Sequence, residues 1–451
     1  MKTKTAPEIF LEKEKCLAAY EWFKKAEAGK SPSWLASYRD EAIARFRDQS
    51  FPTVHDEAWK YTSLEPFAKL AFRPVYRNDS GRINSHAVKN LLGKAPGPRL
   101  VFINGLYAPL FSSTAGLEGN IKMVHLGASW NSEGRLAERS WFPQENVRLE
   151  IFADLNSAFL NDGMMLQLPE NFLVKTPLEC VYLTLPENQK LVSYPRNLIV
   201  AEPGSSAVVV ERYLGLGGNP YFTNAVTDYV IREGASVEAY RLQKETRQAC
   251  HISSTRVSVG RQSRFVFFNM DFGGRLVRNH LSVVFSEEGG ECDLNGLYLA
   301  GEGQHIDNHT VIDHLKPKGT SRQLYKGILG SRSRAVFSGK IFVRQDAQKT
   351  DAAQKNKNLL LSSDARVDTR PQLEILADDV KCAHGAAVGQ LNEDEIFYLR
   401  SRGLGVKEAK KVLTYGFAHE IVDKVGLGAV KEELEHWLED RLESVAHKEE
   451  K

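Results

Sequence analysis

The chain has 451 residues, of which 42% are apolar and 26% are charged, as in folded globular proteins and unlike disordered chains. Its 59 lysines and arginines balance 57 aspartates and glutamates, and the formal charge of +2 argues against a nucleic-acid binder. Five scattered cysteines without a Cys-x-x-Cys pair exclude a disulfide scaffold, and no apolar run approaches the ~18 residues of a membrane span. Because the first residues also lack the apolar segment of a signal peptide, we expect a cytoplasmic protein that binds neither nucleic acid nor membrane.

Helices are predicted at the start of the chain, over residues 8–29 and 31–50. Ser31 and Pro32 supply an N-cap and a first-turn proline for the second helix. Its apolar residues recur at three- and four-residue spacing, at Leu35, Tyr38, Ala42 and Phe46. We assign residues 1–97 to an N-terminal helical region.

From residue 98 to residue 391 the sequence has the composition of short strands and turns. Helical periodicity nearly disappears there, and a unit of a polar turn followed by alternation recurs. Its copies start at residues 204, 234, 262, 290, 331 and 363, at intervals of 30, 28, 28, 41 and 32. Repeats of this length predict a β-solenoid, specifically a parallel β-helix, over a large sandwich, whose turns recur without a longer period. The long interval is predicted to hold an inserted loop at residues 301–320.

Helical patterning returns in residues 392–451. The first predicted helix carries Ile396 and Leu399 and stops at Gly403, and a second covers about residues 406–425. A third helix has an apolar stripe, predicted to pack on the second, at Leu434, Trp437, Leu438 and Leu442. Because solenoids expose edges at both ends, we expect the flanking helices to cap them.

The sequence lacks the phosphate loop of ATPases, the dinucleotide-binding glycine motif, the His-Glu-x-x-His motif and the nucleophile elbow. Its strongest candidate for a functional site is the pair Cys382 and His384, on the last predicted strand. Residues two apart on a strand share a face, so thiol and imidazole can ligate one metal, and these donors suit zinc, copper or iron-sulfur species. The alternative is a small buried cysteine and a hydrogen-bonded histidine.

Two further groups of residues are weaker candidates. His305, Asp307 and His309 share a strand face and form a possible divalent-metal site or an ordinary polar ladder. Cys250 and His251 are adjacent and therefore point to opposite faces. A basic stretch, either an anion site or a solvated charged face, contains Arg322, Lys326, Arg332, Arg334, Lys340 and Arg344.

Four segments resemble a known family. They are residues 59–62 (Trp-Lys-Tyr-Thr), 367–375 (Val-Asp-Thr-Arg-Pro-Gln-Leu-Glu-Ile), 378–386 (Asp-Asp-Val-Lys-Cys-Ala-His-Gly-Ala) and 396–403 (Ile-Phe-Tyr-Leu-Arg-Ser-Arg-Gly). In this order they resemble the SufD branch of the SufB/SufD family, iron-sulfur cluster assembly proteins of the SUF system. Around His384 the SufB branch usually has Glu-His-Glu-Ala, whereas Ala383 stands here where SufD members often have serine.

The resemblance implies a right-handed parallel β-helix between helical N- and C-terminal regions. It also implies a complex with SufB and two copies of the ABC-type ATPase SufC, served indirectly by the sulfur donor SufS with SufE or SufU. In that complex Cys382 and His384 hold iron or a transient iron-sulfur cluster, shared with SufB at the end of the β-helix. The ATPase docks on the C-terminal helices, through Ile396, Phe397, Leu399, Arg400, Arg402 and Gly403. ATP hydrolysis belongs to SufC, which makes this chain a non-enzymatic scaffold.

The resemblance leaves open the cluster type, the binding of a reduced flavin in the complex, and a homodimer formed when SufB is absent. Two other functions remain alternatives. One is a carbohydrate-active β-helix enzyme, which needs paired carboxylates in a groove and which the missing signal peptide disfavours. The other is a purely structural partner that only positions SufB and the ATPase.

Overall fold

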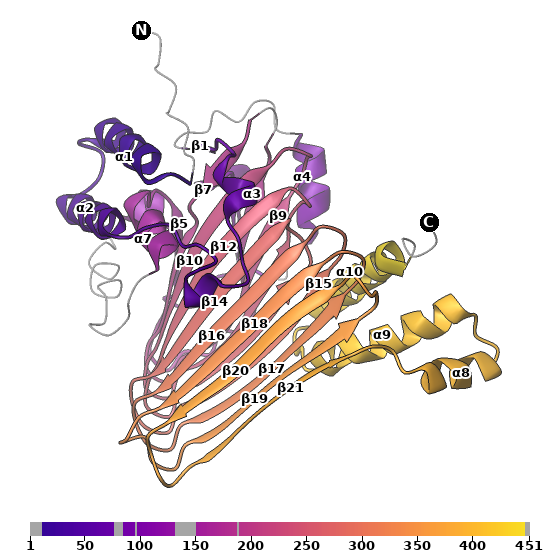
Figure 1. Ribbon diagram of the computed structural model, residues 1–451. Helices are drawn as coiled ribbons and strands as arrows, with labels where there is room; N and C mark the ends of the chain where they lie inside the picture. The colour runs from indigo at the N-terminus through magenta and orange to yellow at the C-terminus, as the bar shows by residue number, and fades with distance from the viewer. Residues whose placement is uncertain (1–10, 76–83, 95–96, 131–149, 187–188, 447–451) are drawn as a thin grey trace.

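The computed structural model describes residues 11–75, 84–94, 97–130, 150–186 and 189–446 (Figure 1). Two long sheets wind around a common interior, and within them only the β2–β3 and β4–β5 pairs are antiparallel. Sheet I contains, in spatial order, β20 (Arg366–Ile375), β18 (Arg334–Val343), β16 (His305–His314), β14 (Leu276–Phe285), β12 (Ala249–Val259), β10 (Tyr221–Ile231), β8 (Arg196–Ala201), β5 (Gly163–Leu168) and β4 (Lys122–His125), with β1 (Arg73–Pro74) and β7 (Leu191–Ser193) beside β10. Sheet II contains β21 (Lys381–Gly389), β19 (Asp351–Leu360), β17 (Thr320–Leu329), β15 (Glu291–Ala300), β13 (Arg264–Asp271), β11 (Ser236–Lys244), β9 (Ser206–Gly215), β6 (Leu178–Thr184), β2 (Arg99–Ile103) and β3 (Leu106–Tyr107).

The fold is the expected parallel β-solenoid, because each coil adds one strand to each sheet. The strands of sheet II from β9 onward start at residues 206, 236, 264, 291, 320, 351 and 381, which gives an even repeat of 27 to 31 residues. The predicted inserted loop at residues 301–320 is therefore wrong, since β16 occupies half of it.

The conformation of the turns explains why the even spacing of the repeat is hard to recognise in the sequence. Before six of these strands, the residue two positions ahead has a positive φ. The residues in this position are Gly204, Gly234, Gln262, Gly289, Lys318 and Lys349. Glycine adopts this conformation freely, and lysine does so here at φ angles of 63° and 60°. Once lysine replaces glycine, composition no longer marks the turn.

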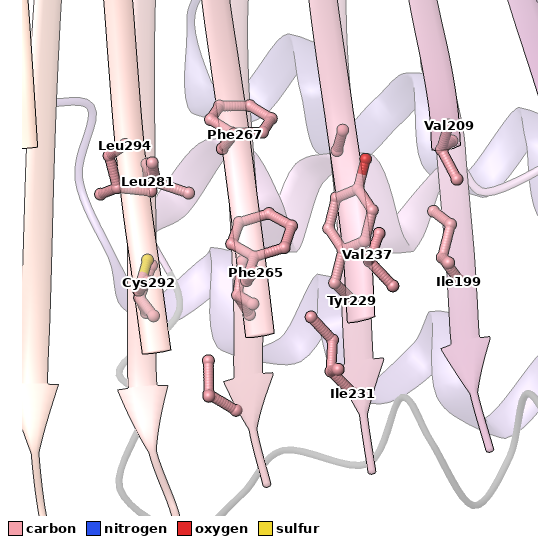
Figure 2. Close-up of a cluster of buried hydrophobic side chains, with 14 of the residues drawn as sticks. Ile199, Val209, Tyr229, Ile231, Val237, Phe265, Phe267, Leu281, Cys292 and Leu294 are labelled. Carbon is pink, nitrogen blue, oxygen red and sulfur yellow. The ribbon is translucent and has the colours of Figure 1, made fainter. Parts of the chain in front are cut away.

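The interior of the solenoid is apolar along one side. Figure 2 shows stacked side chains from successive coils in contact, among them Val237, Phe265 and Cys292, which occupy one register position on β11, β13 and β15. All three are at most 3% exposed. Burial of this continuous column gives the parallel coils their main stabilisation, because a single rung cannot shield its apolar face.

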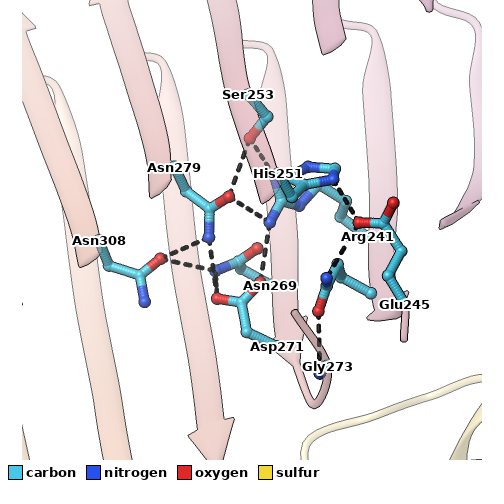
Figure 3. A network of polar contacts seen from close by, with 10 residues as sticks. Arg241, Glu245, His251, Ser253, Asn269, Asp271, Gly273, Asn279 and Asn308 are labelled. Carbon is cyan, nitrogen blue, oxygen red and sulfur yellow. Dashed lines mark hydrogen bonds and ion pairs between the residues drawn. The ribbon is translucent and has the colours of Figure 1, made fainter. Parts of the chain in front are cut away.

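The other side of the interior is polar and fully buried. Arg241 donates to Asp271 at 2.9 Å and to Asn279 at 2.5 Å, while Asp271 also accepts from Asn269 and Asn279 at 2.9 Å (Figure 3). Asn308 accepts from the same two asparagines, at 3.0 and 2.9 Å. Hydrogen bonding on this scale compensates for burying the charged pair away from water.

Most of the N-terminal helices cover the outside of sheet I. The N-terminal helices are α1 (Lys13–Glu27), α2 (Ser33–Asp48), η1 (Glu57–Trp59), α3 (Glu65–Ala68), α4 (Ser85–Leu92), η2 (Pro109–Phe111), α5 (Leu126–Ser129) and α7 (Ile151–Ala158). Of these, α1, α2, η1, α3 and α7 share an apolar cluster with the outer face of sheet I, whereas α4 packs in the cluster on sheet II. The helix of residues 31–50 starts at Ser33, later than predicted, and Ser31 accepts a hydrogen bond from Arg39 instead of capping it.

Helix α7 was missed because every residue in it is buried. A helix buried on all sides has no polar face, so it shows no amphipathic period in the sequence.

The C-terminal helices lie along the outside of sheet II. They are α8 (Glu393–Ser401), α9 (Val406–Val422) and α10 (Gly428–Ala446), and α8 projects away from the strands (Figure 1). The apolar stripe of α10 packs on the sheet as well as near α9, with the Trp437 ring 5.6 Å from the Phe272 ring. The flanking helices therefore cover sheet faces, and within the described ranges no strand pairs with the outer edge of β20 or β21.

Candidate functional site

Cys382 and His384 lie on β21, at the open end of the solenoid. In the parallel register Cys382 is paired with Ala352 and His384 with Gln354, and both partners are buried residues of the interior. The thiol and the imidazole therefore project from the same, inward side of the last rung. Cys382 is half-buried and His384 is exposed, so neither is enclosed in the core.

The Cys382 thiol packs against the edge of the apolar interior. This burial raises its pKa above the usual 9.0, and the carboxylate of Asp351 raises it further, while a backbone hydrogen bond with Ala352 opposes the shift. At neutral pH the sulfur thus carries its proton, and a metal or another cation must displace it before the thiolate can act as a ligand.

The pair provides two donors of different chemistry. A tetrahedral metal site uses four ligands, and among the residues that the structure describes no group of three or more His, Cys, Asp and Glu side chains is placed to hold a metal. The geometry is that of a partial ligand set facing an uncovered rim.

Cys382 and His384 lie among the exposed residues of the last two strands. Nothing in the sequence indicated this exposed surface. Beyond β19 and β18, almost every side chain of β21 is exposed, and those of β20 are half-buried or exposed. Three large apolar side chains are exposed here, to 40%, 55% and 48%: Ile375 on β20, Leu376 directly after it, and Val388 on β21. Open edges with exposed apolar residues are characteristic of strand-pairing interfaces.

The second candidate group has a structural role. His305, Asp307 and His309 share the outer face of sheet I as predicted. Asp307 forms a buried ion pair with Arg278, lies 2.9 Å from His309, and accepts a 2.5 Å hydrogen bond from Thr62. Their donor atoms are thus already engaged in packing the N-terminal segment onto the sheet.

The segment at residues 59–62 completes this contact. The Arg278 guanidinium stacks on the Trp59 ring, with its Cζ 3.8 Å from the ring centroid. The Thr62 hydroxyl lies 2.9 Å from Nε2 of His305. Burial lowers the pKa of His305 to about 4, and Arg278 holds the pKa of Asp307 far below its usual value. The motif therefore anchors the N-terminal region to the solenoid.

The adjacent pair Cys250 and His251 and the basic stretch also have structural explanations. Cys250 lies in the cluster under the N-terminal helices, while His251 points into the solenoid, 2.7 Å from Glu245, so they share no site. All six cations of the basic stretch are ion-paired, which supports the charged-face interpretation. The pairs are Arg322–Asp351, Lys326–Glu420, Arg332–Glu302, Arg334–Asp368, Lys340–Glu374 and Arg344–Asp313.

Helix α8 presents an apolar and basic surface. Ile396 is buried, whereas Phe397 is 71% exposed and Arg400 and Arg402 are exposed. Gly403, at φ 97°, ends the helix with a Schellman turn in which its N–H donates to the carbonyl of Arg400 at 3.0 Å. Leu399 is only half-buried.

Family models cover most of the chain. The SufBD protein N-terminal region matches residues 12–180, and the SUF system FeS cluster assembly, SufBD core domain, matches residues 184–417. The chain belongs to the SufBD family. As a SufBD protein it is an iron-sulfur cluster assembly protein, and the carbohydrate-enzyme alternative is abandoned.

Relatives agree over nearly the full length of this SufBD chain. It is 33% identical to an iron-sulfur cluster assembly SufBD family protein of Synechocystis, over 90% of this chain and 91% of the relative. It is 30% identical to the iron-sulfur cluster assembly protein SufD of Escherichia coli, over 85% and 87%, and 24% identical to SufD of Bacillus subtilis, over 92% and 96%. No helix in the described ranges has the length and apolar character needed to span a membrane.

Proposed function

We propose that this chain is a SufD-type scaffold that assembles and transfers iron-sulfur clusters together with SufB and the ATPase SufC. The observation that carries the proposal is the inward projection of Cys382 and His384 from an uncovered terminal rung. Iron or a nascent cluster is the cargo of this pair, and SufB supplies the missing ligands.

A divided ligand set suits transfer. Thiolate and imidazole donors bind iron-sulfur species well. A closed set of four ligands in one chain retains its metal, whereas a set shared between two chains loses half of its ligands when the chains separate. The raised pKa of Cys382 adds to this, because a proton competes with the cargo for the sulfur and so favours release of the cargo.

The edges of β20 and β21 are the surface on which SufB pairs. Their outer backbone groups have no strand partner in the described chain, and strand addition satisfies such groups while burying Val388 and Ile375. A strand placed there also covers His384. This would bring the partner's ligands next to the Cys382 sulfur.

SufC docks on α8 in this proposal, and hydrolyses the ATP. Phe397 provides an exposed aromatic anchor, with Arg400 and Arg402 beside it, a combination enriched at protein interfaces. Ile396 and Gly403 act indirectly, since the first packs inward and the second forms the turn into α9.

The test for the ligand pair is anaerobic cluster reconstitution of the co-expressed complex. Cys382→Ser and His384→Ala should each lower the cluster yield by at least tenfold with the complex still assembled. Ala383→Ser, on the opposite face of the same strand, is the matched control and should leave the yield unchanged. A normal yield from both ligand variants would reduce the chain to a purely structural partner.

The docking surface is tested by co-purification with SufC. Phe397→Asp should abolish capture of the ATPase, whereas Glu432→Arg, a charge reversal on the exposed surface of α10, should not. If the Phe397 variant still captures SufC, the ATPase binds elsewhere.

A further inference from the structure

The interior column beneath His384 becomes polar toward the open end. In sheet II this register position is occupied by Phe267 on β13 and Leu294 on β15, both apolar. Gln323 on β17 and Gln354 on β19 follow, and then His384 on β21. Both glutamines are buried, Gln354 completely.

The two glutamines form a directed hydrogen-bond ladder. Gln323 donates from Nε2 to the Thr310 hydroxyl at 2.7 Å, and its Oε1 accepts from Nε2 of Gln354 at 2.7 Å. The Gln354 amide lies against Gly339, where a Cβ would stand 2.1 Å from Nε2. The absence of a side chain at Gly339 thus leaves space for the amide.

One atom at the end of this ladder has no partner. Oε1 of Gln354 is buried and accepts no hydrogen bond from any residue that the structure describes. An unsatisfied buried acceptor costs about 1–3 kcal/mol, and native proteins rarely leave one without a purpose. The next side chain along the column is His384.

The geometry of neighbouring strands brings a ring nitrogen within reach. Parallel strands lie about 4.8 Å apart. Oε1 of glutamine and Nε2 of histidine lie the same number of bonds from their Cα atoms, so they reach equal depth in the interior. His384 is exposed and free to change rotamer, which lets its ring turn onto the amide.

We propose that Gln354 is a positioning residue whose Oε1 accepts the Nε2–H of His384. This leaves Nδ1 unprotonated and nearer the backbone, on the same side as the Cys382 sulfur, as the nitrogen that binds the iron cargo. Metal-binding histidines usually donate their other ring N–H to an oxygen acceptor, which fixes the ring and raises its basicity. The metal-binding part of the assignment rests on the proposed function, whereas the hydrogen bond does not.

Nuclear magnetic resonance of the full chain, labelled with ¹⁵N at histidine, tests the hydrogen bond without any metal. We expect a single Nε2–H tautomer of His384, with its ring proton exchanging at least tenfold more slowly than in Gln354→Met. Gln354→Glu keeps an acceptor and should keep the slow exchange. Gln372→Met, on the outward face of β20, is the matched control.

Binding of Co²⁺ to the same variants provides the second measurement. Gln354→Met should weaken binding by 10- to 100-fold, and Gln354→Glu should restore it. An Nδ1–H tautomer, or wild-type exchange and Co²⁺ binding in Gln354→Met, would overturn the assignment. If the hydrogen bond is intact but His384→Ala leaves the cluster yield normal, the proposed function fails and the hydrogen-bond assignment stands.

Discussion

Acid sensitivity of the solenoid should arise in part from His314, the buried last residue of β16. Its ring stacks on Phe285 at 4.2 Å, and its Nε2 lies 3.0 Å from the Ser321 hydroxyl. Burial lowers its pKa to about 4 from the ordinary 6.5. Substitution His314→Phe keeps an aromatic ring in the stack and removes the titrating group.

The magnitude follows from proton linkage. Because the folded state resists protonation, the stability that His314 contributes is complete above pH 6.5 and is lost as the pH falls toward 4. With these two pKa values the loss between pH 7 and pH 5 is about 2 kcal/mol, and it approaches about 3 kcal/mol below pH 4. His314→Phe should be less stable than wild type at pH 7, since it lacks the hydrogen bond to Ser321, and should lose about 2 kcal/mol less on acidification.

Urea unfolding, followed by circular dichroism at pH 7 and pH 5, measures this difference directly. A ¹³C titration of the His314 ring should give an apparent pKa near 4. If the variant and the wild type lose equal stability between the two pH values, or if the ring titrates near 6.5, the His314 side chain is not buried as a neutral group.

Three further changes probe the contacts that hold the helical regions on the solenoid. Arg278→Met should destabilise the fold by about 3–5 kcal/mol in urea, since it leaves Asp307 buried without its cation; a loss below 1 kcal/mol would contradict this. Gly403→Ala should cost about 1 kcal/mol by forcing alanine to a φ of 97°, seen as faster amide exchange in α8 than in wild type. Glu420→Gln should cost about 1–3 kcal/mol and loosen α9, because Lys326 loses its 2.5 Å carboxylate partner; unchanged exchange in α9 would disprove the coupling.

The sequence was sufficient for the fold class because its physical signal is local. Glycines such as Gly204 and Gly234 mark turns with positive φ, and alternation marks the strands that follow. The signal failed where a different residue took the same conformation, as Lys318 did, and where burial removed the polar face of a helix, as in α7.

The candidate site was partly visible. Strand alternation correctly placed Cys382 and His384 on one face, but alternation cannot say which face is inside. The ladder that leads to His384 was invisible because its members, such as Gln323 and Gln354, lie 31 residues apart and meet only through the coil repeat. The role of Thr62 was hidden for the same reason, since its partner His305 is 243 positions away.

In the register column of sheet II that ends at His384, apolar side chains give way to amides, and the local stability of the coils should fall in the same direction. In this column the earlier coils contribute apolar side chains such as Phe267, while the last coils before β21 contribute amides such as Gln354, whose hydrogen bonds water can replace. Breathing motions should therefore begin at the rim and fade toward the N-terminal coils. The last coils can therefore open locally under a mechanical force while the N-terminal coils stay folded.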